Sequence, residues 1–436
     1  MAKVTLFWMR RDLRLEDNAG LYHALKQGAA VLPVFIFDTE ILKHLGTEDL
    51  RVQFIHQRLI DLKSQLQQLG SDLVVRLGQP LQVWQELLQD FAVESVYFNH
   101  DYEPYARRRD QEIIDLLRQR GVAVYSFKDQ TLFEKDEVLS DQKKPYTVYT
   151  PYKKKVLAKL AQSDFFLKSY PSENYFSKFA KIKDSIPMLE LEQIGFKSQE
   201  FTYPQLDLNV EMLKKYSERR DFPYLQQATS HLGLHLRFGT VSVRELAREG
   251  QRYSDTWLSE LIWRDFFMQI LWHFPEVEKR SFRPIYDQIA WRNAPEDLSR
   301  WQSGQTGYPI VDAGMRELNA TGYMHNRVRM IVASFLTKHL LIHWREGERY
   351  FASKLLDYDL SANNGNWQWA AGSGCDAAPY FRIFNPEAQT EKFDPDYIYI
   401  KKWVPEYGTP KYPRPMVDHV FARGRCLQEF SKVLKK

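Results

Sequence analysis

The sequence predicts an α/β N-terminal domain with a doubly wound parallel sheet, followed by a large all-α C-terminal domain. Three observations lead there. Up to about residue 130, short apolar runs alternate with amphipathic stretches of helical periodicity, the pattern of successive βαβ units. From Met212 onward the strong patterns are helical. At 436 residues, the chain is also too long for a single hydrophobic core.

The first elements are buried strands separated by helices. Apolar runs predict strands at Val4–Trp8, Ala30–Phe37, Leu73–Leu77, Ser95–Asn99 and Val122–Phe127. Between them, Arg51–Leu69 and Pro80–Phe91 have helical periodicity. No GxGxxG motif follows the first strand, so the common dinucleotide-binding fingerprint is absent from this domain.

The domain boundaries follow the change in composition. Residues 1–130 form the expected α/β domain, residues 131–205 a polar interdomain linker, and residues 206–436 the helical domain. Several expected helices begin at capping residues. The full set of expected helices is Ser242–Glu249, Thr256–His273, Ile310–Thr321, Asn326–Trp344 and Gly347–Leu356. The last segment, 414–436, is expected to be a short tail.

Composition restricts the class of protein. Only Cys375 and Cys426 occur, which excludes a disulfide framework and a four-cysteine metal site and suits a reducing cytoplasm. The sequence has no apolar run of membrane-spanning length and begins without a signal-peptide pattern. The net charge is +4, and basic side chains are interleaved with aromatic ones in the C-terminal half. Such a mixture suits either an ordinary solvated surface or contacts with nucleic-acid phosphates and bases.

Four segments of the helical half combine aromatic with polar or charged side chains. They are 257–264, 324–330, 357–369 and 379–389. The third contains Asp357, Asp359, Asn363, Trp367 and Trp369 within thirteen residues. Large aromatic faces beside fixed polar groups suit a flat heteroaromatic ligand. A capped helix start with two core tryptophans explains the same residues, and the segment alone leaves both readings open.

These motifs resemble the cryptochrome/photolyase family and, within it, the class I cyclobutane pyrimidine dimer photolyases. The resemblance runs essentially from end to end and is strongest in blocks 301–315, 324–330, 344–351 and 357–369. It implies a DNA-repair lyase driven by light, in which reduced FAD passes an electron to a pyrimidine dimer, the cyclobutane ring splits, and the electron returns. The partner would be ultraviolet-damaged DNA, single- or double-stranded, and the protein a monomer.

The resemblance places FAD within the helical domain. The implied cofactor-binding residues are Tyr216, Thr229, Ser230, His231, Leu232, Gly233, Trp257, Glu260, Arg264, Arg329, Asp357, Tyr358, Asp359 and Asn363. Gly233 replaces the serine of many relatives, and one extra residue separates Tyr216 from Thr229. Taken alone, Thr229 and Ser230 would suit a helix cap. Asn363 falls where a residue faces flavin N5, and a neutral amide there favours the fully reduced cofactor that repair requires.

The resemblance also implies a lesion pocket. Glu260, Trp263, Met330, Asn363 and Trp369 are the implied catalytic residues, with Trp263 and Trp369 as aromatic walls around a flipped dimer. The implied DNA-binding residues are Arg220, Glu260, Trp263, Asn326, Arg327, Met330, Trp369, Arg382 and Gln389. His325 is followed by Asn326 rather than by a second histidine, which argues against repair of (6-4) lesions.

Two further features depend on the resemblance. Trp301, Trp344 and Trp367 match a chain that carries electrons from the surface to photoexcited flavin, although each alone is typical of a core residue. Arg51, Asp101 and Glu103 match an antenna site in the α/β domain. An 8-hydroxy-deazaflavin-type chromophore or a flavin suits that site better than methenyltetrahydrofolate, and the absence of any antenna remains an alternative.

Two other functions compete with repair. A blue-light receptor would use the same FAD and tryptophans for signalling, but Asn363 and the short tail argue against it. A DNA-binding flavoprotein without catalysis is disfavoured by the complete set of lesion-pocket residues.

Overall fold

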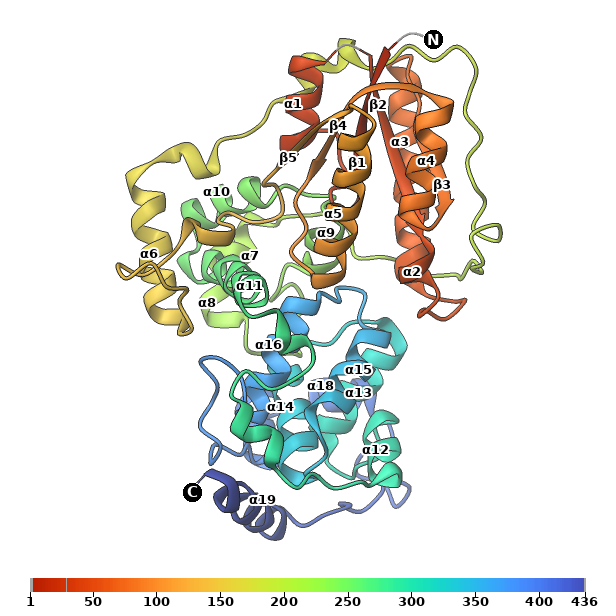
Figure 1. Cartoon of the computed structure of the whole chain (residues 1–436). Helices are drawn as coiled ribbons and strands as arrows, with labels where there is room; N and C mark the ends of the chain where they lie inside the picture. Colours follow the sequence, from red (N-terminus) through yellow and green to blue (C-terminus); the bar gives the residue numbers. More distant parts are fainter. Residues whose placement is uncertain (1–2, 29, 435–436) are drawn as a thin grey trace. The chain divides into compact units, whose positions relative to one another are not determined.

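The computed structural model describes residues 3–28 and 30–434, which form two compact units (Figure 1). The described residues of Met1–Glu134, Leu157–Leu206 and His231–Glu249 form the first unit, called the α/β unit. Lys135–Val156, Asp207–Ser230 and the described part of Gly250–Lys436 form the helical unit. The stretch expected to be a linker is therefore divided between the two units.

The α/β unit is built on a five-stranded parallel sheet with strand order β3-β2-β1-β4-β5. The strands are β1 (Lys3–Met9), β2 (Val31–Asp38), β3 (Val74–Gly78), β4 (Ala92–Asn99) and β5 (Ala123–Phe127). The chain proceeds from β1 to β2 and β3, then returns to the other side of β1 for β4 and β5. This is the doubly wound arrangement, and it confirms the predicted fold class of the first unit.

Helices cover both faces of this sheet because alternate strand residues are apolar on each side. Leu6 and Trp8 of β1 belong to the core that α4 (Pro80–Asp90) and α5 (Pro104–Gln119) share. Phe7 faces the other way, and a Cβ on Gly20 of α1 (Ala19–Gln27) would lie 3.0 Å from its ring. The remaining helices that lie wholly in this unit are α2 (Thr39–Leu42), α3 (Leu50–Gln68), η2 (Asp164–Leu167), η3 (Ser172–Lys178) and α9 (Gly233–Phe238).

The helical unit contains no strand among its described residues and packs around a core of aromatic and aliphatic side chains. Its longer helices are α11 (Asp255–His273), α12 (Pro295–Gln302), α13 (Pro309–Thr321), α14 (Asn326–Ser334), α15 (Trp344–Lys354), α16 (Leu360–Ala371), α17 (Pro386–Phe393) and α19 (His419–Leu434). Shorter ones are η1 (Lys135–Glu137), α7 (Val210–Lys214), α8 (Tyr216–Arg219), η4 (Pro275–Glu278), η5 (Pro284–Gln288) and α18 (Ile398–Trp403). Two helices, α6 (Tyr149–Gln162) and α10 (Val243–Tyr253), have residues in both units.

The helix expected over Asn326–Trp344 is wrong in its second half. α14 ends at Ser334, a π-helical turn follows at Phe335–His339 (η6), and Trp344 begins α15. Leu341 has a φ of 52°, in the left-handed region that an α-helix excludes. The turn is fully buried, and Lys338 donates a hydrogen bond to the carbonyl of Ala371 at 2.7 Å. Packing against neighbouring elements therefore overrides the helical pattern of the sequence.

Within the described residues, no helix is both long and apolar enough to cross a membrane.

Candidate active site

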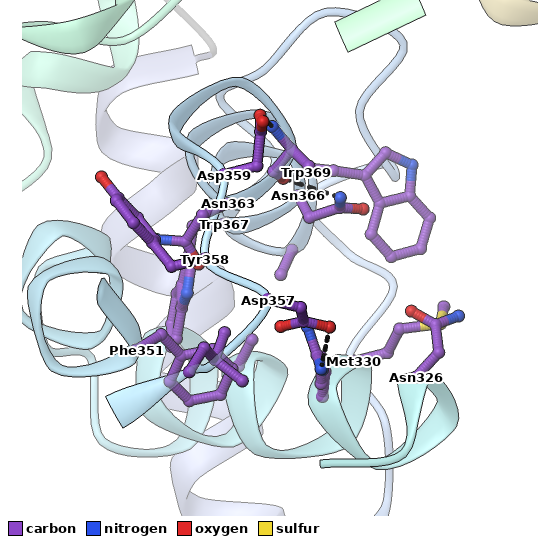
Figure 2. A pocket seen from close by; sticks show the side chains of 15 residues that line it. Asn326, Met330, Phe351, Asp357, Tyr358, Asp359, Asn363, Asn366, Trp367 and Trp369 are labelled. Carbon is purple, nitrogen blue, oxygen red and sulfur yellow. Dashed lines mark hydrogen bonds and ion pairs between the residues drawn. The ribbon is translucent and has the colours of Figure 1, made fainter. Parts of the chain in front are cut away.

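A pocket between α14 and α16 is lined mostly by residues of two of the four singled-out segments, 324–330 and 357–369 (Figure 2). It contains about 600 Å³ of space, part of it open to solvent. Nine expected site residues line it: Asn326, Arg329, Met330, Asp357, Tyr358, Asp359, Asn363, Trp367 and Trp369. The sequence did not single out Ala333, Phe351, Leu355, Ala362, Asn366 and Ala370, which complete the wall.

The pocket wall formed by α16 results from ordinary helix chemistry. Asp359 is the N-cap, and its carboxylate accepts from the backbone N–H groups of Ser361 and Ala362. Asn363 and Trp367 follow at four-residue spacing and therefore lie along one stripe of the helix. The segment is thus a capped helix start, and the following turns form one wall of the pocket.

The two tryptophans of α16 occupy different sides of the pocket. Trp367 is almost fully buried and packs edge-on against Phe351, with ring centroids 5.0 Å apart. Trp369 is half-buried, and in Figure 2 its ring lies on the side of Asn326 and Met330. Side chains two residues apart on a helix point about 200° apart, which explains the separation.

An ion pair crosses the pocket floor. Arg329 Nη2 lies 2.9 Å from Asp357 Oδ2, and Arg329 Nε donates to the carbonyl of Met324. Burial works against the charge of Arg329, but Asp357 outweighs it and raises the pKa of the guanidinium. The second carboxylate oxygen of Asp357 is buried without a hydrogen-bond partner. A buried acceptor left unpaired beside a cavity indicates a missing donor.

Asn363 is oriented by a residue that sequence reasoning missed. Its amide nitrogen donates to the Glu348 carboxylate at 2.9 Å and to the Glu348 carbonyl at 3.1 Å. Burial raises the pKa of the Glu348 carboxyl. These bonds engage the amide nitrogen, so the amide oxygen of Asn363 can accept a hydrogen bond from a donor in the pocket. Glu348 belongs to the motif that begins at Trp344. It lies too far from Asn363 in the sequence for any local pattern to predict the contact.

A second cluster lies on α11, outside the lining of the pocket. Glu260 forms an ion pair with Arg220. Trp263 stacks face to face on Tyr149, with ring centroids 3.5 Å apart and planes 8° apart. Trp257 is buried on the same helix, and Arg264 lies next to Asp265, 3.9 Å away. Tyr149 is a further residue that the sequence did not identify, because it lies in the stretch expected to be a linker.

The expected phosphate-contacting arginines are spread over three segments. Arg327 of α14 has its guanidinium carbon 4.4 Å from the centre of the Phe393 ring, at the end of α17. Gln389 lies half-buried on the same helix. Arg382 is exposed in the loop that precedes α17.

The residues expected to hold the phosphates of the cofactor are Tyr216 and residues 229–233. Tyr216 is buried, and burial followed by the charge of Glu260 raises the pKa of its hydroxyl. Thr229 Oγ1 lies 3.3 Å from the hydroxyl of Tyr323. Thr229 and Ser230 belong to the helical unit, whereas His231, Leu232 and Gly233 belong to the α/β unit.

The three tryptophans of the expected relay all lie in the core of the helical unit. Trp367 and Trp301 are in edge contact, with ring centroids 6.1 Å apart. Trp301 is completely buried, and so is Trp344 apart from 1% of its surface. Trp291, which the sequence did not single out, is half-buried and lies 5.3 Å from the ring of His343. The ring of His343 is in turn 5.6 Å from that of Trp344.

Two of the three expected antenna residues, Asp101 and Glu103, follow the carboxyl end of β4 in the α/β unit. Arg11 pairs with Asp101 at 3.3 Å and with Glu103 at 3.0 Å. Arg51 instead pairs with Asp49, the N-cap of α3. The strand order changes direction between β1 and β4, and ligands of open α/β sheets bind at such a point.

Comparison with known proteins identifies the family. A model described as DNA photolyase matches residues 5–171, and one described as the FAD binding domain of DNA photolyase matches residues 257–410. A curated deoxyribodipyrimidine photo-lyase of Halobacterium salinarum is 37% identical, over 98% of this chain and 98% of its own length. That of Escherichia coli is 34% identical, over 99% of both chains. The chain belongs to the DNA photolyase family.

Solved structures of the photolyase and cryptochrome fold match as completely. A bacterial class III photolyase from Agrobacterium tumefaciens is 34% identical with a TM-score of 0.88, covering 100% of this chain and 98% of the other. An archaeal photolyase from Sulfolobus tokodaii, solved with two FAD molecules, is 34% identical with a TM-score of 0.84, over 99% and 100%. A Synechocystis cryptochrome is 26% identical with a TM-score of 0.85, over 98% and 99%. The predicted α/β domain followed by a helical FAD-binding domain is confirmed.

The pocket fits the flavin of a photolyase. Its lining combines apolar surface from Phe351 and Leu355 with the unpaired Asp357 oxygen and the Asn363 amide oxygen. An isoalloxazine ring is flat, apolar on its faces and polar at its edge, so it complements both kinds of surface. The pocket contains no group of three or more metal-ligating side chains, and none exists elsewhere in the described residues.

Proposed function

We propose that this protein is a light-driven deoxyribodipyrimidine photo-lyase that splits cyclobutane pyrimidine dimers in DNA. The proposal is supported by the full-length sequence similarity to enzymes of that name, since the alignments cover both units. Bound FAD, in its reduced form, would supply the light absorption and the electron. The residues of the chain bind and orient the reactants and set the charge around them.

Arg329 and Asp357 would hold the polar edge of the flavin. Arg329 is a fixed positive charge within the pocket, and a nearby cation favours the anionic form of an acidic group. Asp357 offers its unpaired oxygen to a ring N–H, and Asp359 lies at the same end of α16. Asn363, held by Glu348, would present its amide oxygen to N5.

The lesion would enter beside the second cluster. A pyrimidine dimer has to leave the base stack to reach a buried cofactor. Trp263 and Trp369 would form the two walls around it, with Asn326 and Met330 on the side of Trp369. Glu260 would accept a hydrogen bond from the damaged base, and Arg220, Arg327, Arg382 and Gln389 would contact the flanking phosphates.

Electrons that regenerate the reduced flavin would enter through tryptophans. Trp367 lines the pocket, whereas Trp301 is completely buried and offers no surface end. Trp291 is half-buried and connects through His343 to Trp344. We therefore assign the outer end of the relay to Trp291, with Trp301 as an inner neighbour of Trp367.

A second chromophore would occupy the α/β unit near Asp101 and Glu103. The archaeal relative solved with two FAD molecules supports a flavin or deazaflavin there over a folate. An absorption spectrum of purified holoprotein distinguishes the three, because each has a different band. The protein is further proposed to act as a cytoplasmic monomer on single- or double-stranded damaged DNA.

The decisive experiment illuminates the reduced holoprotein with a dimer-containing thymine oligomer and follows the recovery of thymine absorbance. Recovery that depends on light is expected, and its absence from fully reduced protein would contradict the proposal and leave a blue-light receptor as the alternative. Glu260→Gln should lower the repair yield about tenfold, because a charge-assisted hydrogen bond to the base becomes a neutral one. FAD content should not change. Loss of FAD together with repair would instead place Glu260 at the cofactor.

A further inference from the structure

Four side chains of alternating charge form a row that begins on α11: Glu260, Arg220, Asp221 and Arg327. Glu260 pairs with Arg220, and Arg220 Nε lies 3.9 Å from Asp221 Oδ1. The same Asp221 oxygen lies 2.8 Å from Arg327 Nη2. Two carboxylates therefore neutralise the two arginines that are expected to hold DNA phosphates.

Aromatic rings fix the position of both guanidinium groups. Arg220 lies 5.2 Å from the ring centre of Tyr216, and Arg327 lies 4.4 Å from that of Phe393. Phe222, next to Asp221 in the chain, also contacts the Phe393 ring. Because the rings hold the cations in place, the anion that accompanies each arginine can be exchanged without moving the arginine.

Arg327 has an additional unused donor. Its Nε is buried without a hydrogen-bond partner, while Nη2 binds Asp221 and Nη1 contacts the sulfur of Met330 at 3.8 Å. The Asp221 side chain is 40% exposed, whereas that of Arg327 is 19% exposed. An incoming phosphate therefore meets Asp221 first and competes with it for the better-protected cation.

We propose that Asp221 occupies the place of a backbone phosphate in the DNA-free protein and thereby reduces binding to undamaged DNA. The inference rests on the proposed function, and it adds a residue that sets discrimination between damaged and undamaged strands. On binding, a DNA phosphate takes the place of the Asp221 carboxylate beside Arg327. One anion replaces another, so the net gain in charge pairing is small unless a second carboxylate also leaves the arginines.

The lesion provides that release through Glu260. When a damaged base donates a hydrogen bond to Glu260, the ion pair between Glu260 and Arg220 is broken. Arg220 can then balance the charges of both Asp221 and a phosphate. Undamaged DNA offers no flipped base, so Glu260 keeps Arg220, and Asp221 is left poorly compensated once phosphate takes Arg327. The unfavourable charge of Asp221 is therefore larger in the undamaged complex.

The test measures binding in the dark with full-length holoprotein. Fluorescence anisotropy with labelled oligomers, with and without one thymine dimer, gives both dissociation constants over a salt series. Asp221→Asn should strengthen binding to the undamaged oligomer about fivefold and to the damaged one about twofold or less. The slope of log affinity against log salt concentration should steepen for the undamaged oligomer by the equivalent of about one phosphate contact. Glu218→Gln is the matched control, because exposed Glu218 on α8 loses the same charge and forms no ion pair within the described part of the chain.

Each outcome decides between explanations. Unchanged or weaker binding by Asp221→Asn, with FAD content retained, would overturn the inference and make Asp221 a structural support for the arginines. An equal effect from Glu218→Gln would also overturn it, because general charge would then suffice. Wild-type protein that binds DNA without preference for the dimer would contradict the proposed function and the inference together, whereas an unchanged ratio of the two dissociation constants in Asp221→Asn would overturn the inference alone.

Discussion

Trp263 packs against two aromatic neighbours. One face is covered by Tyr149, and Phe267 lies 5.6 Å away with its ring plane at 25°. The Tyr149 hydroxyl donates to the carbonyl of Ser259 at 2.8 Å, and its backbone N–H donates to Asp376 at 3.0 Å. A lesion wall backed by aromatic neighbours keeps its angle when a base arrives, so less conformational freedom is lost on binding.

Replacing Tyr149 by Leu should weaken binding of the dimer-containing oligomer about fivefold, because an aromatic pair contributes about 1 kcal/mol beyond its buried area. Tyr149→Phe is the control, since it keeps the stacked ring and loses only the hydrogen bond to Ser259. Its affinity should stay within about twofold of wild type. Equal losses in both variants would show that the hydroxyl, and not the ring, supports Trp263.

Helices α15 and α16 are in close contact at Gly347. A Cβ there would lie 2.1 Å from Trp367 Cη2 and 2.7 Å from Leu336 Cδ2. Trp367 is almost fully buried and is in edge contact with the rings of Phe351 and Trp301. The absence of a side chain at Gly347 is therefore what allows Trp367 to reach the pocket.

Gly347→Ala should lower the free energy of unfolding by about 2 kcal/mol, the usual cost of overpacking a filled core. Displacement of Trp367 should also slow photoreduction of the flavin. Denaturant unfolding and illumination in the presence of an external reductant measure the two effects. Gly424→Ala in α19, where nothing lies within 4 Å of the new Cβ, should be neutral or stabilising. Similar destabilisation at both positions would show that helix geometry rather than contact with Trp367 is responsible.

Local sequence patterns predicted the elements well and the side-chain partners poorly. The five strands, α3, α4, α11 and α13 agree with expectation to within a few residues, because apolar periodicity reports which face is buried. The π turn after Ser334 could not be predicted, since burial against α16 and α19 causes it. Glu348 and Tyr149 were missed for a related reason, because each acts through a contact between segments far apart in the chain.

The helical unit contains histidines whose burial couples its stability to pH. His343 is the N-cap of α15, and its Nδ1 accepts from the backbone N–H of Arg345 at 3.1 Å. Burial, and then the charge of Arg345, lowers the pKa of His343 to about 4. Protonation would remove the acceptor and break the cap. Because the unfolded chain takes up this proton near pH 6.5 and the folded one only near 4, stability is complete above pH 6.5 and falls as the pH decreases between these values.

His343→Asn keeps a capping acceptor that does not titrate, so it should flatten the fall in stability between pH 7 and pH 5 by about 1 kcal/mol, a value reduced for the partial exposure of the ring. Urea unfolding at the two pH values measures the slope. The exposed His44, replaced in the same way, should leave the slope unchanged. A steeper slope in His343→Asn would mean that other groups dominate the acid response.

One helix, α16, carries residues of three expected tasks: Asn363 at the cofactor, Trp367 in the electron relay and Trp369 at the lesion wall. A rigid helix links these positions mechanically, so a small rotation about its axis shifts all three together. A substitution in α16 that changes the surroundings of the flavin therefore also moves the relay and lesion-wall residues. The enzyme stays active only if repair and photoreduction both tolerate that displacement. To engineer a photolyase with a different absorption wavelength or substrate, α16 should therefore be exchanged as one unit, together with its Asp359 cap and its neighbour Gly347, rather than one residue at a time.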